Sequence, residues 1–348
     1  MKVGLIGFGF MGKMHAQAYQ QLAMTKGKLA ELAAVADAHP ENARKSLAQL
    51  GLTETPVYTS LAALLDGEEV DVIDVCLPTH MHLEVCLAAI AAGKAIFCEK
   101  PLALSSEEAF KIAHAAESAG VPFQVGHVIR FWPEYQELAR LADSESLGRL
   151  LSLNLQRRAP RPTYASGGWL LDHTLSKGAM LDLHIHDTDY LIQLLGEPEA
   201  VTSWGTREED AGWTHVFTRY HYPDLAVIAE GGWNYPAEWE FRMGFDAVFE
   251  RGALDYDSTR TPALQLTALG EAPRKVEVER AQAGASRAGV GNIADLGAYY
   301  SEIEYFVSCL QRGEQPAIAT ARQAALSVRV VMAELESAET SETVRVKS

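Results

Sequence analysis

The sequence predicts an α/β N-terminal Rossmann domain with a doubly wound parallel sheet, then an α+β domain with a large, mainly antiparallel open sheet. The chain has 348 residues, which suggests about two domains on the rough scale of ~150 residues each. Short apolar runs alternate with helical segments up to about residue 125, whereas strand patterns follow one another from about residue 149. We place the two domains at residues 1–124 and 125–348, the first for dinucleotide binding and the second for substrate binding and oligomerisation.

The N-terminal domain alternates strands and helices. Continuous apolar runs, which are typical of strands covered on both faces, occupy residues 2–6, 32–36, 70–77, 95–99 and 122–125. Segments with helical periodicity lie between them, at residues 12–23, 40–50, 82–93 and 105–120. Ser105 followed by Glu108 predicts the start of the last helix. This alternation indicates a parallel sheet with right-handed crossovers.

The C-terminal domain shows strict alternation. In FRMGFDAVF, residues 241–249, every second residue is apolar, which predicts a strand with one buried face. Similar runs predict further strands at 149–158, 215–222, 225–233 and 274–279. Helices are predicted on one face of this sheet, near 178–195, 294–312 and 319–336.

Composition excludes several classes of partner. The formal net charge of -16 repels phosphate backbones and anionic lipid surfaces, so we expect no nucleic-acid or membrane partner. The chain runs from Met1 directly into an apolar strand pattern, and from this we expect a cytoplasmic protein. Four widely spaced cysteines show neither CxxC spacing nor a disulfide framework, so we expect buried thiols and no metal site.

A glycine-rich loop follows the first predicted strand and opens the first predicted helix. It has the form G-x-G-x-x-G and comprises Gly7, Phe8, Gly9, Phe10, Met11 and Gly12. Gly7 suits a tight turn, Gly9 the approach of a pyrophosphate, and Gly12 close packing of the helix on the strand. The phosphates would rest on the helix N-terminus, where free N–H groups favour an anion. The loop predicts dinucleotide binding.

Asp37, at the end of the second predicted strand, favours NAD over NADP. Its carboxylate can accept hydrogen bonds from the adenosine ribose and would repel a 2′-phosphate. Ala38, His39 and Pro40 follow, so no cation stands next to it. The alternative is a solvated loop aspartate.

The segment VCLPTHMHLEVCLAAIAAGKAIFCEKP, residues 75–101, ends in an acid, a base and a proline. Pro78, Thr79, His82 and the triplet Glu99-Lys100-Pro101 resemble the segment between the fourth and fifth strands of the Gfo/Idh/MocA family, which includes glucose–fructose oxidoreductase and inositol dehydrogenase. Thr79 stands where that family usually has asparagine. An isolated Glu-Lys pair at a strand end would otherwise be simply hydrated.

The resemblance continues in the second domain. Within WLLDHTLSKGAMLDLHIHDTDYLIQLLG, residues 169–196, Asp182 and His186 fall where the family places an Asp and a His four apart on a helix, so they share one face. Lys177 stands where the family commonly has glycine, and His184 where a small residue is usual, which bears on the local turn and pocket volume. The similarity is close over the first 130 residues and looser over 299–331.

The resemblance implies an NAD(P)-dependent dehydrogenase acting on a secondary alcohol of a polyol, cyclitol or sugar. His186 would be the general base, Asp182 would orient it, and Lys100 would stabilise the developing alkoxide. Glu99 would orient the strand end or the nicotinamide side. The cofactor would contact the glycine loop and a further set comprising Asp37, Pro78, Thr79, His82, Glu99 and Lys100. Family relatives are commonly dimers or tetramers, so a homodimer or homotetramer is expected.

Several alternatives stay open. The HIHD string could bind a metal if it were a strand, but the spacing of Leu181, Ile185 and Ile192 predicts a helix, on which His184 and His186 diverge.

A basic and aromatic stretch precedes this helix: Arg157, Arg158, Arg161, Tyr164 and Trp169. It could clamp a carboxylate or stack on a sugar, and Arg161 and Trp169 are tentative substrate residues beside Lys100, Asp182 and His186. The stretch could equally be a solvated strand end. Two other functions also remain possible, an NAD-dependent glycosidase of the same fold and a non-catalytic NAD-binding regulator.

Overall fold

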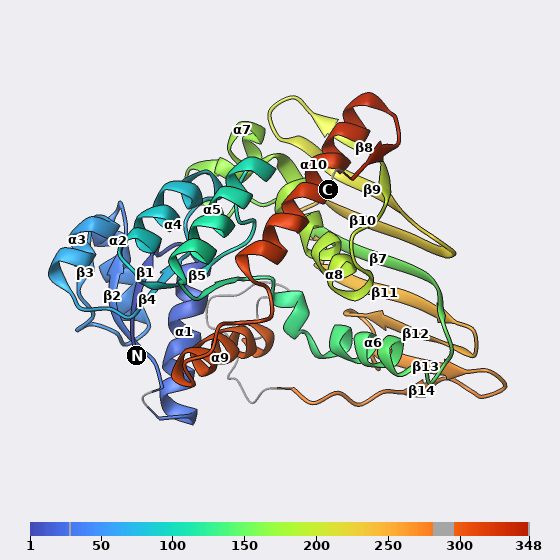
Figure 1. Ribbon diagram of the computed structural model, residues 1–348, viewed down its shortest axis with the longest axis horizontal. Coiled ribbons are helices and arrows are strands. Elements are labelled where there is room, and N and C mark those ends of the chain that lie inside the picture. Colours follow the sequence, from blue (N-terminus) through green and yellow to red (C-terminus); the bar gives the residue numbers. More distant parts are fainter. Residues whose placement is uncertain (28, 281–295, 347–348) are drawn as a thin grey trace. The chain divides into compact units, whose positions relative to one another are not determined.

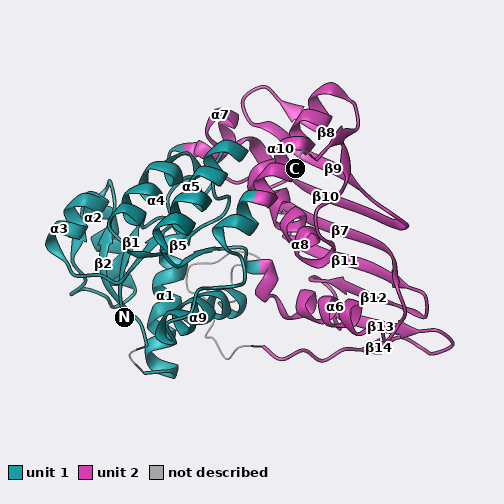
Figure 2. Ribbon diagram, viewed as in Figure 1, with its two compact units in different colours: residues 1–128, 164–167, 281–325 teal, residues 129–163, 168–280, 326–348 magenta. Residues whose placement is uncertain are grey.

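The computed structural model describes residues 1–27, 29–280 and 296–346. The chain forms two compact units, shown in Figure 2. Unit 1 comprises residues 1–128, 164–167 and 281–325, and unit 2 comprises residues 129–163, 168–280 and 326–348. Within the described residues, no helix is both long enough and apolar enough to span a bilayer.

Unit 1 is built on six parallel strands in the order β3-β2-β1-β4-β5-β6 (Figure 1). The strands are β1 (Lys2–Ile6), β2 (Glu31–Ala36), β3 (Val57–Tyr58), β4 (Val72–Val75), β5 (Ala95–Cys98) and β6 (Phe123–Val125). The helices between them are α1 (Phe10–Thr25), α2 (Pro40–Gln49), α3 (Leu61–Gly67), α4 (His82–Ala91) and α5 (Ser106–Ala119). The predicted doubly wound parallel sheet is confirmed, with β3 and α3 as additions that the apolar runs did not reveal.

A local signal explains where α5 begins, whereas α1 is covered by a helix from a distant part of the chain. The Ser105 side chain accepts a hydrogen bond from the Glu108 N–H at 3.2 Å, so the predicted start of α5 is confirmed. Helix α1 is covered by α9 (Gly297–Gln311), which comes from much later in the chain. Buried side chains of α9, among them Ile303 and Phe306, share a core with Val3, Tyr19 and Leu22.

Unit 2 contains a nine-stranded sheet in the order β14-β13-β12-β11-β7-β10-β9-β8-β15. Among its described strands only the β7 and β10 pair is parallel. The strands are β7 (Leu150–Pro160), β8 (Ala200–Glu208), β9 (Gly212–Tyr222), β10 (Leu225–Tyr235), β11 (Arg242–Phe249), β12 (Gly252–Asp257), β13 (Leu264–Ala268), β14 (Arg274–Lys275) and β15 (Val344–Arg345). The predicted mainly antiparallel sheet is confirmed.

Period-two alternation is visible in β11. Met243, Phe245 and Phe249 are buried, whereas Asp246 and Val248 on the opposite face are exposed.

The remaining helical elements are η2 (Val128–Phe131), α6 (Pro133–Ser144), η3 (Ser166–Leu171), α7 (His173–Ser176), η4 (Met180–His184), α8 (Ile185–Leu195) and α10 (Ala321–Thr340), together with η1 (Thr79–Met81) of unit 1.

Three local expectations need correction or restriction. The single helix expected over 178–195 is a π-helix, η4, followed by α8. The strand expected over 274–279 is reduced to the two residues of β14. Of the helix expected over 294–312, the first two positions lie outside the described residues, and the rest corresponds to α9.

Candidate active site

Two glycines of the loop after β1 are required by the packing of unit 1. Gly7 has φ +92°, and a Cβ atom there would lie 2.7 Å from the carbonyl oxygen of Cys76. A Cβ atom on Gly12 would lie 2.2 Å from the carbonyl oxygen of Gly7. These contacts hold α1 close against the ends of β1 and β4, which is the role expected of these glycines.

Gly9 differs, because nothing in the described part of the chain requires a glycine there. Its φ is -75°, and a Cβ atom would have no neighbour within 4 Å. Gly9 is the N-cap residue of α1, whose first turn contains no acidic residue. The open space and the uncapped N–H groups fit a pyrophosphate that approaches the backbone closely.

The contrast between two glycines gives a prediction. Gly12→Ala should lower the free energy of unfolding by about 1–3 kcal/mol, because the new methyl group meets backbone that cannot move aside. Gly9→Ala should fold like the wild type but bind NAD at least about tenfold more weakly. Thermal unfolding and calorimetric titration with NAD measure the two effects. Equal NAD affinity in Gly9→Ala and the wild type would show that the cofactor does not approach Gly9.

Asp37 is held at the end of β2 by backbone groups. Its two carboxylate oxygens accept hydrogen bonds from the N–H groups of Phe8 and His39, both at 2.7 Å. The Phe8 side chain is buried in the core, so Phe8 acts through its backbone to fix Asp37. Phe10, half-buried in the first turn of α1, contacts the ring of Tyr164 at 5.4 Å between centroids.

His82 connects the loops that follow β4 and β5 through contacts of its ring with one carbonyl group in each loop. Its ring is fully buried, with Nδ1 at 2.8 Å from the carbonyl oxygen of Pro101 and Nε2 at 2.8 Å from that of Leu77. Burial lowers the pKa of His82, against the effect of these carbonyl groups. Because both ring nitrogens face main-chain carbonyls, we expect His82 to support the cofactor through the two loops. Thr79, in the first of these loops, is buried.

Glu99 and Lys100, at the end of β5, have different surroundings. The Glu99 carboxylate is buried and accepts hydrogen bonds from His15 at 3.0 Å and from the backbone N–H of Lys100 at 3.1 Å. Lys100 is half-buried, and the Lys100–Pro101 peptide is cis, as the sequence allows. The interpretation of the pair as two hydrated charges is therefore wrong for Glu99.

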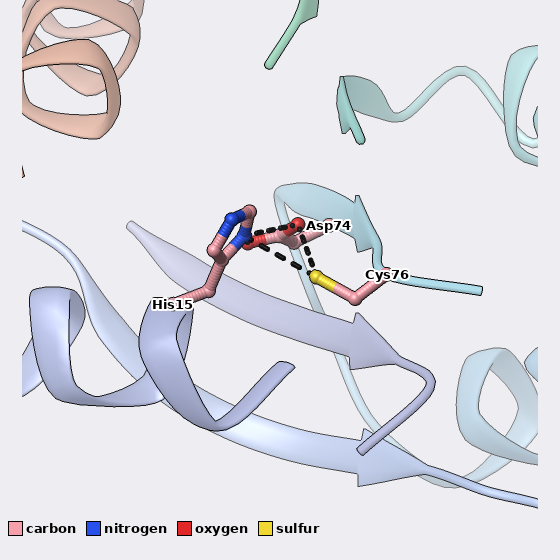
Figure 3. A group of neighbouring side chains, drawn as sticks. All are labelled: His15, Asp74 and Cys76. Atoms are coloured by element: carbon pink, nitrogen blue, oxygen red, sulfur yellow. Dashed lines mark hydrogen bonds and ion pairs between the residues drawn. The ribbon is translucent and has the colours of Figure 1, made fainter. Parts of the chain in front are cut away.

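A buried network lies behind Glu99, and sequence reasoning missed it. His15 contacts the Asp74 carboxylate at 2.9 Å, and the Tyr19 hydroxyl donates to the same carboxylate at 2.8 Å. Figure 3 shows His15 from α1 facing Asp74 and Cys76 from β4 and the residues after it. The only available signal was an acid, Asp74, inside the apolar run of β4.

Two groups in this network have the composition of metal ligands. They are His15, Asp74 and Cys76, and His15, Glu99 and Glu302. In both groups the His15 nitrogens already lie within 3.0 Å of carboxylate oxygens. We therefore interpret His15, Asp74, Cys76 and Glu99 as one hydrogen-bonded network, with the Glu302 carboxyl group beside it.

In unit 2, Asp182 lies in the π-helix η4 and His186 in the first turn of α8, and both are half-buried. A π-helical turn is often found at functional sites, and no sequence pattern had indicated this one. His184 is fully buried instead, with Nε2 at 3.2 Å from the hydroxyls of Thr218 and Tyr220. Burial, followed by the charge of Arg157, lowers the pKa of His184 to about 3.

The two departures from the family pattern have local explanations. His184 fits against the sheet because Gly231 has no side chain; a Cβ atom there would lie 2.7 Å from His184 Nδ1. Lys177 ends α7 with φ +61°, the left-handed region that favours glycine. Lys177 therefore keeps the turn despite its side chain.

The basic stretch is resolved into three ion pairs. Arg157 is buried and binds Asp187 through two hydrogen bonds of 2.9 and 3.0 Å. Arg158 pairs with Glu230, and the exposed Arg161 pairs with Glu208 at 2.8 Å. Arg157 is thus a structural residue of unit 2. Trp169 lies half-buried in η3.

Family models match both parts of the chain. Residues 1–127 match the GFO_IDH_MocA model, described as an oxidoreductase family with an NAD-binding Rossmann fold. Residues 135–255 match the GFO/IDH/MocA C-terminal domain. The chain belongs to the Gfo/Idh/MocA family. The family that the sequence resembles is thereby confirmed.

Individual Gfo/Idh/MocA members show the same relationship. Over 210 residues the chain is 30% identical to levoglucosan dehydrogenase from Pseudarthrobacter phenanthrenivorans, covering 58% of this chain and 53% of the relative. It is 36% identical over 205 residues to inositol 2-dehydrogenase 2 from Saccharopolyspora erythraea, covering 58% of this chain and 56% of the relative. The chain thus spans about half the length of these curated relatives.

A solved structure extends the similarity of the fold to the whole chain. The complex of levoglucosan dehydrogenase with NADH and levoglucosan superimposes with a TM-score of 0.85 at 22% identity, covering 100% of both chains. Within the Gfo/Idh/MocA family, therefore, the fold extends beyond the segments that align in sequence.

Proposed function

We propose that the protein is an NAD-dependent dehydrogenase that transfers a hydride between a secondary alcohol of a polyol, cyclitol or sugar and nicotinamide. The observation that carries this proposal is the position of Lys100. Lys100 is the second residue after β5, and the glycine loop follows β1, so both lie at the carboxyl edge of the same parallel sheet. Open α/β sheets bind their ligands at this edge. Relatives named as inositol and levoglucosan dehydrogenases support the class of substrate.

Each of the proposed site residues would have a separate role in the reaction. Bound NAD supplies the hydride acceptor, and the protein positions the substrate carbon. The Lys100 ammonium would stabilise negative charge on the substrate oxygen. His186 would accept the hydroxyl proton, and Asp182 would orient its imidazole. Arg161 and Trp169 remain proposed substrate contacts.

NAD is the proposed cofactor, with NADP disfavoured. The Asp37 carboxylate is fixed by two backbone N–H groups at the end of β2. A fixed negative charge there suits a ribose diol and repels a 2′-phosphate. The family description of residues 1–127 as an NAD-binding Rossmann fold supports this choice.

The proposal is tested with polyols, inositols and aldoses, each assayed with NAD and with NADP by the absorbance of the reduced nicotinamide. Reduction of NAD by at least one member of the panel is expected. A glycoside is assayed alongside the panel, and release of its aglycone without net reduction of NAD would indicate a glycosidase instead. Tight NAD binding without turnover of any member would indicate a regulator.

We also propose that the protein is a homodimer or homotetramer formed through the open face of the nine-stranded sheet. Five rings of this sheet and its loops contact one another in sequence, and an arginine side chain lies over the last ring. In order, these residues are Trp204, Phe217, His215, Tyr235, Trp239 and Arg242. Trp204 is 48% exposed, which is unusual for so large an aromatic residue. A second copy of the chain would cover this series.

Replacing Trp204 gives a test of the oligomer. Trp204→Glu should reduce the mass measured by light scattering towards that of one chain of 38.0 kDa, because a charge would be buried in the subunit contact. Leu269→Glu, at a residue that is 80% exposed in the turn after β13, is the matched control and should leave the mass unchanged. An unaltered oligomer in Trp204→Glu would place the interface elsewhere.

A cytoplasmic location is proposed as well. The described cysteines are all free thiols, including Cys86 and Cys98, whose sulfur atoms lie 3.7 Å apart. Reduced thiols are typical of the cytoplasm. Cell fractionation tests this location.

A further inference from the structure

The imidazole of His15 lies between two carboxylates inside unit 1. Nδ1 is 2.9 Å from Asp74 Oδ2, and Nε2 is 3.0 Å from Glu99 Oε1. His15 and Asp74 have no exposed surface, and the Glu99 side chain is 7% exposed. An ionised carboxylate only accepts hydrogen bonds, so each ring nitrogen has to donate one. A histidine that donates from both nitrogens is a cation.

We propose that His15 is a positioning residue that holds the Glu99 carboxylate in place and thereby fixes the backbone of Lys100. The step from Glu99 to Lys100 is direct, because Glu99 Oε1 faces His15 while Oε2 accepts the Lys100 N–H at 3.1 Å. The inference rests on the proposed function in so far as Lys100 acts in catalysis. His15 itself belongs to α1, the helix that begins at the glycine loop.

The groups around His15 support its positive charge. Burial alone would lower the pKa of His15, but the Asp74 carboxylate and, to a smaller extent, Cys76 raise it well above its ordinary value. The Tyr19 hydroxyl donates to Asp74 from α1, and the edge of the Phe97 ring faces His15.

Burial and neighbouring charges also shift the pKa values of Glu99 and Glu302. Burial opposes ionisation of Glu99, but the hydrogen bond and charge of His15, with Lys100, lower its pKa. Glu302 of α9 has its pKa raised well above the ordinary value by burial and by the Glu99 charge. Neither oxygen of Glu302 has a hydrogen-bond partner among the described residues. Burial and the neighbouring Glu99 charge therefore favour the neutral form of Glu302, whereas Glu99 lies beside the cation of His15.

Replacing His15 should make the backbone of Lys100 less firmly held without changing the glycine loop. In His15→Gln, Glu99 loses a cation within hydrogen-bond distance, so its pKa should rise by about 1–3 units. Glu99 then takes up a proton at a less acidic pH and accepts the Lys100 N–H more weakly. We expect the acid limb of kcat/KM to move to higher pH, and kcat at neutral pH to fall by about 10²-fold. The Kd for NAD should stay within about threefold.

The first experiment does not depend on catalysis. Amide hydrogen exchange at Lys100 is measured in the full chain for wild type, His15→Gln and Tyr19→Phe. Exchange at Lys100 should accelerate at least about tenfold in His15→Gln. Tyr19→Phe is the matched control, because it removes a partner of Asp74 but leaves the contact between His15 and Glu99; exchange should change much less. Equal acceleration in both variants, or none in His15→Gln, would overturn the proposal.

Nitrogen NMR of the imidazole gives a second measurement that needs only the wild-type chain, with the signal assigned by through-bond correlation to the backbone of His15. Both ring nitrogens should remain protonated at about pH 8, well above the ordinary histidine pKa of about 6.5. A neutral ring at that pH would overturn the proposal even if His15→Gln fails to fold.

A double-mutant cycle separates positioning from general damage. Glu99→Gln removes the charge that His15 holds, so adding His15→Gln to it should lower kcat by less than about threefold further. An equally large loss in both backgrounds would show that His15 does not act through Glu99. If the wild type turns over no polyol or sugar, the proposed function fails, and amide exchange and the imidazole signal still decide the role of His15.

Discussion

Lys100→Ala is expected to lower kcat by about three orders of magnitude or more while the Kd for NAD changes little. In the proposed reaction the substrate oxygen would become negatively charged as its proton leaves, and removing the ammonium group would remove the charge proposed to stabilise it. The cofactor would be held mainly by the glycine loop and Asp37, which do not depend on this side chain. Steady-state kinetics with the best substrate of the panel and calorimetric titration with NAD measure the two quantities.

Lys94 offers a matched control for this experiment. It lies just before β5, whereas Lys100 lies just after it, and both lysines are half-buried. Lys94→Ala should keep wild-type turnover, because its end of the strand is opposite to the ligand-binding edge. If Lys100→Ala turned over at the wild-type rate, the assignment of Lys100 would be wrong.

Arg157→Met is expected to lower the free energy of unfolding by about 3–5 kcal/mol. The variant leaves the Asp187 carboxylate buried without the guanidinium that binds it through two hydrogen bonds. An unpaired charge inside a protein is far less stable than a buried pair. Denaturant unfolding followed by circular dichroism gives the difference.

Two further variants show whether the pair is responsible. Arg157→Met combined with Asp187→Leu should recover most of the lost stability, because an apolar pair of similar volume needs no compensating charge. Arg161→Met breaks a pair whose side chains are 40% and 38% exposed, and should cost less than about 1 kcal/mol. Similar losses in Arg157→Met and Arg161→Met would contradict the assignment of Arg157 to the core.

The parts of the site that the sequence predicts are those built from neighbouring residues. The glycine loop is a local pattern, and the close contacts around Gly7 and Gly12 agree with it. The network around His15 is different, because its partners Asp74 and Glu99 lie 59 and 84 residues away in sequence. Only the strand order of the sheet brings such residues together, and no pattern along the chain encodes that contact.

The basic stretch shows a second limit. Adjacent residues of a strand point to opposite faces, so Arg157 and Arg158 were bound to have different surroundings. Which of them is buried depends on the helices that cover the sheet. Arg157 donates to Asp187 on α8, whereas Arg158 donates to Glu230 on β10. The π-helical turn at 180–184 was likewise not predicted, because a segment of five residues is too short to show a period of its own in the apolar spacing.

The covering of α1 by α9 has a consequence for how the protein is made. The ring of Phe97 on β5 packs against that of Phe306, although about two hundred residues are synthesised between them. A nascent chain in which α1 has left the ribosome and α9 has not therefore exposes an apolar surface on α1. The core of unit 1 becomes complete only when α9 has also emerged. Expression of residues 1–128 alone should therefore yield an aggregation-prone fragment.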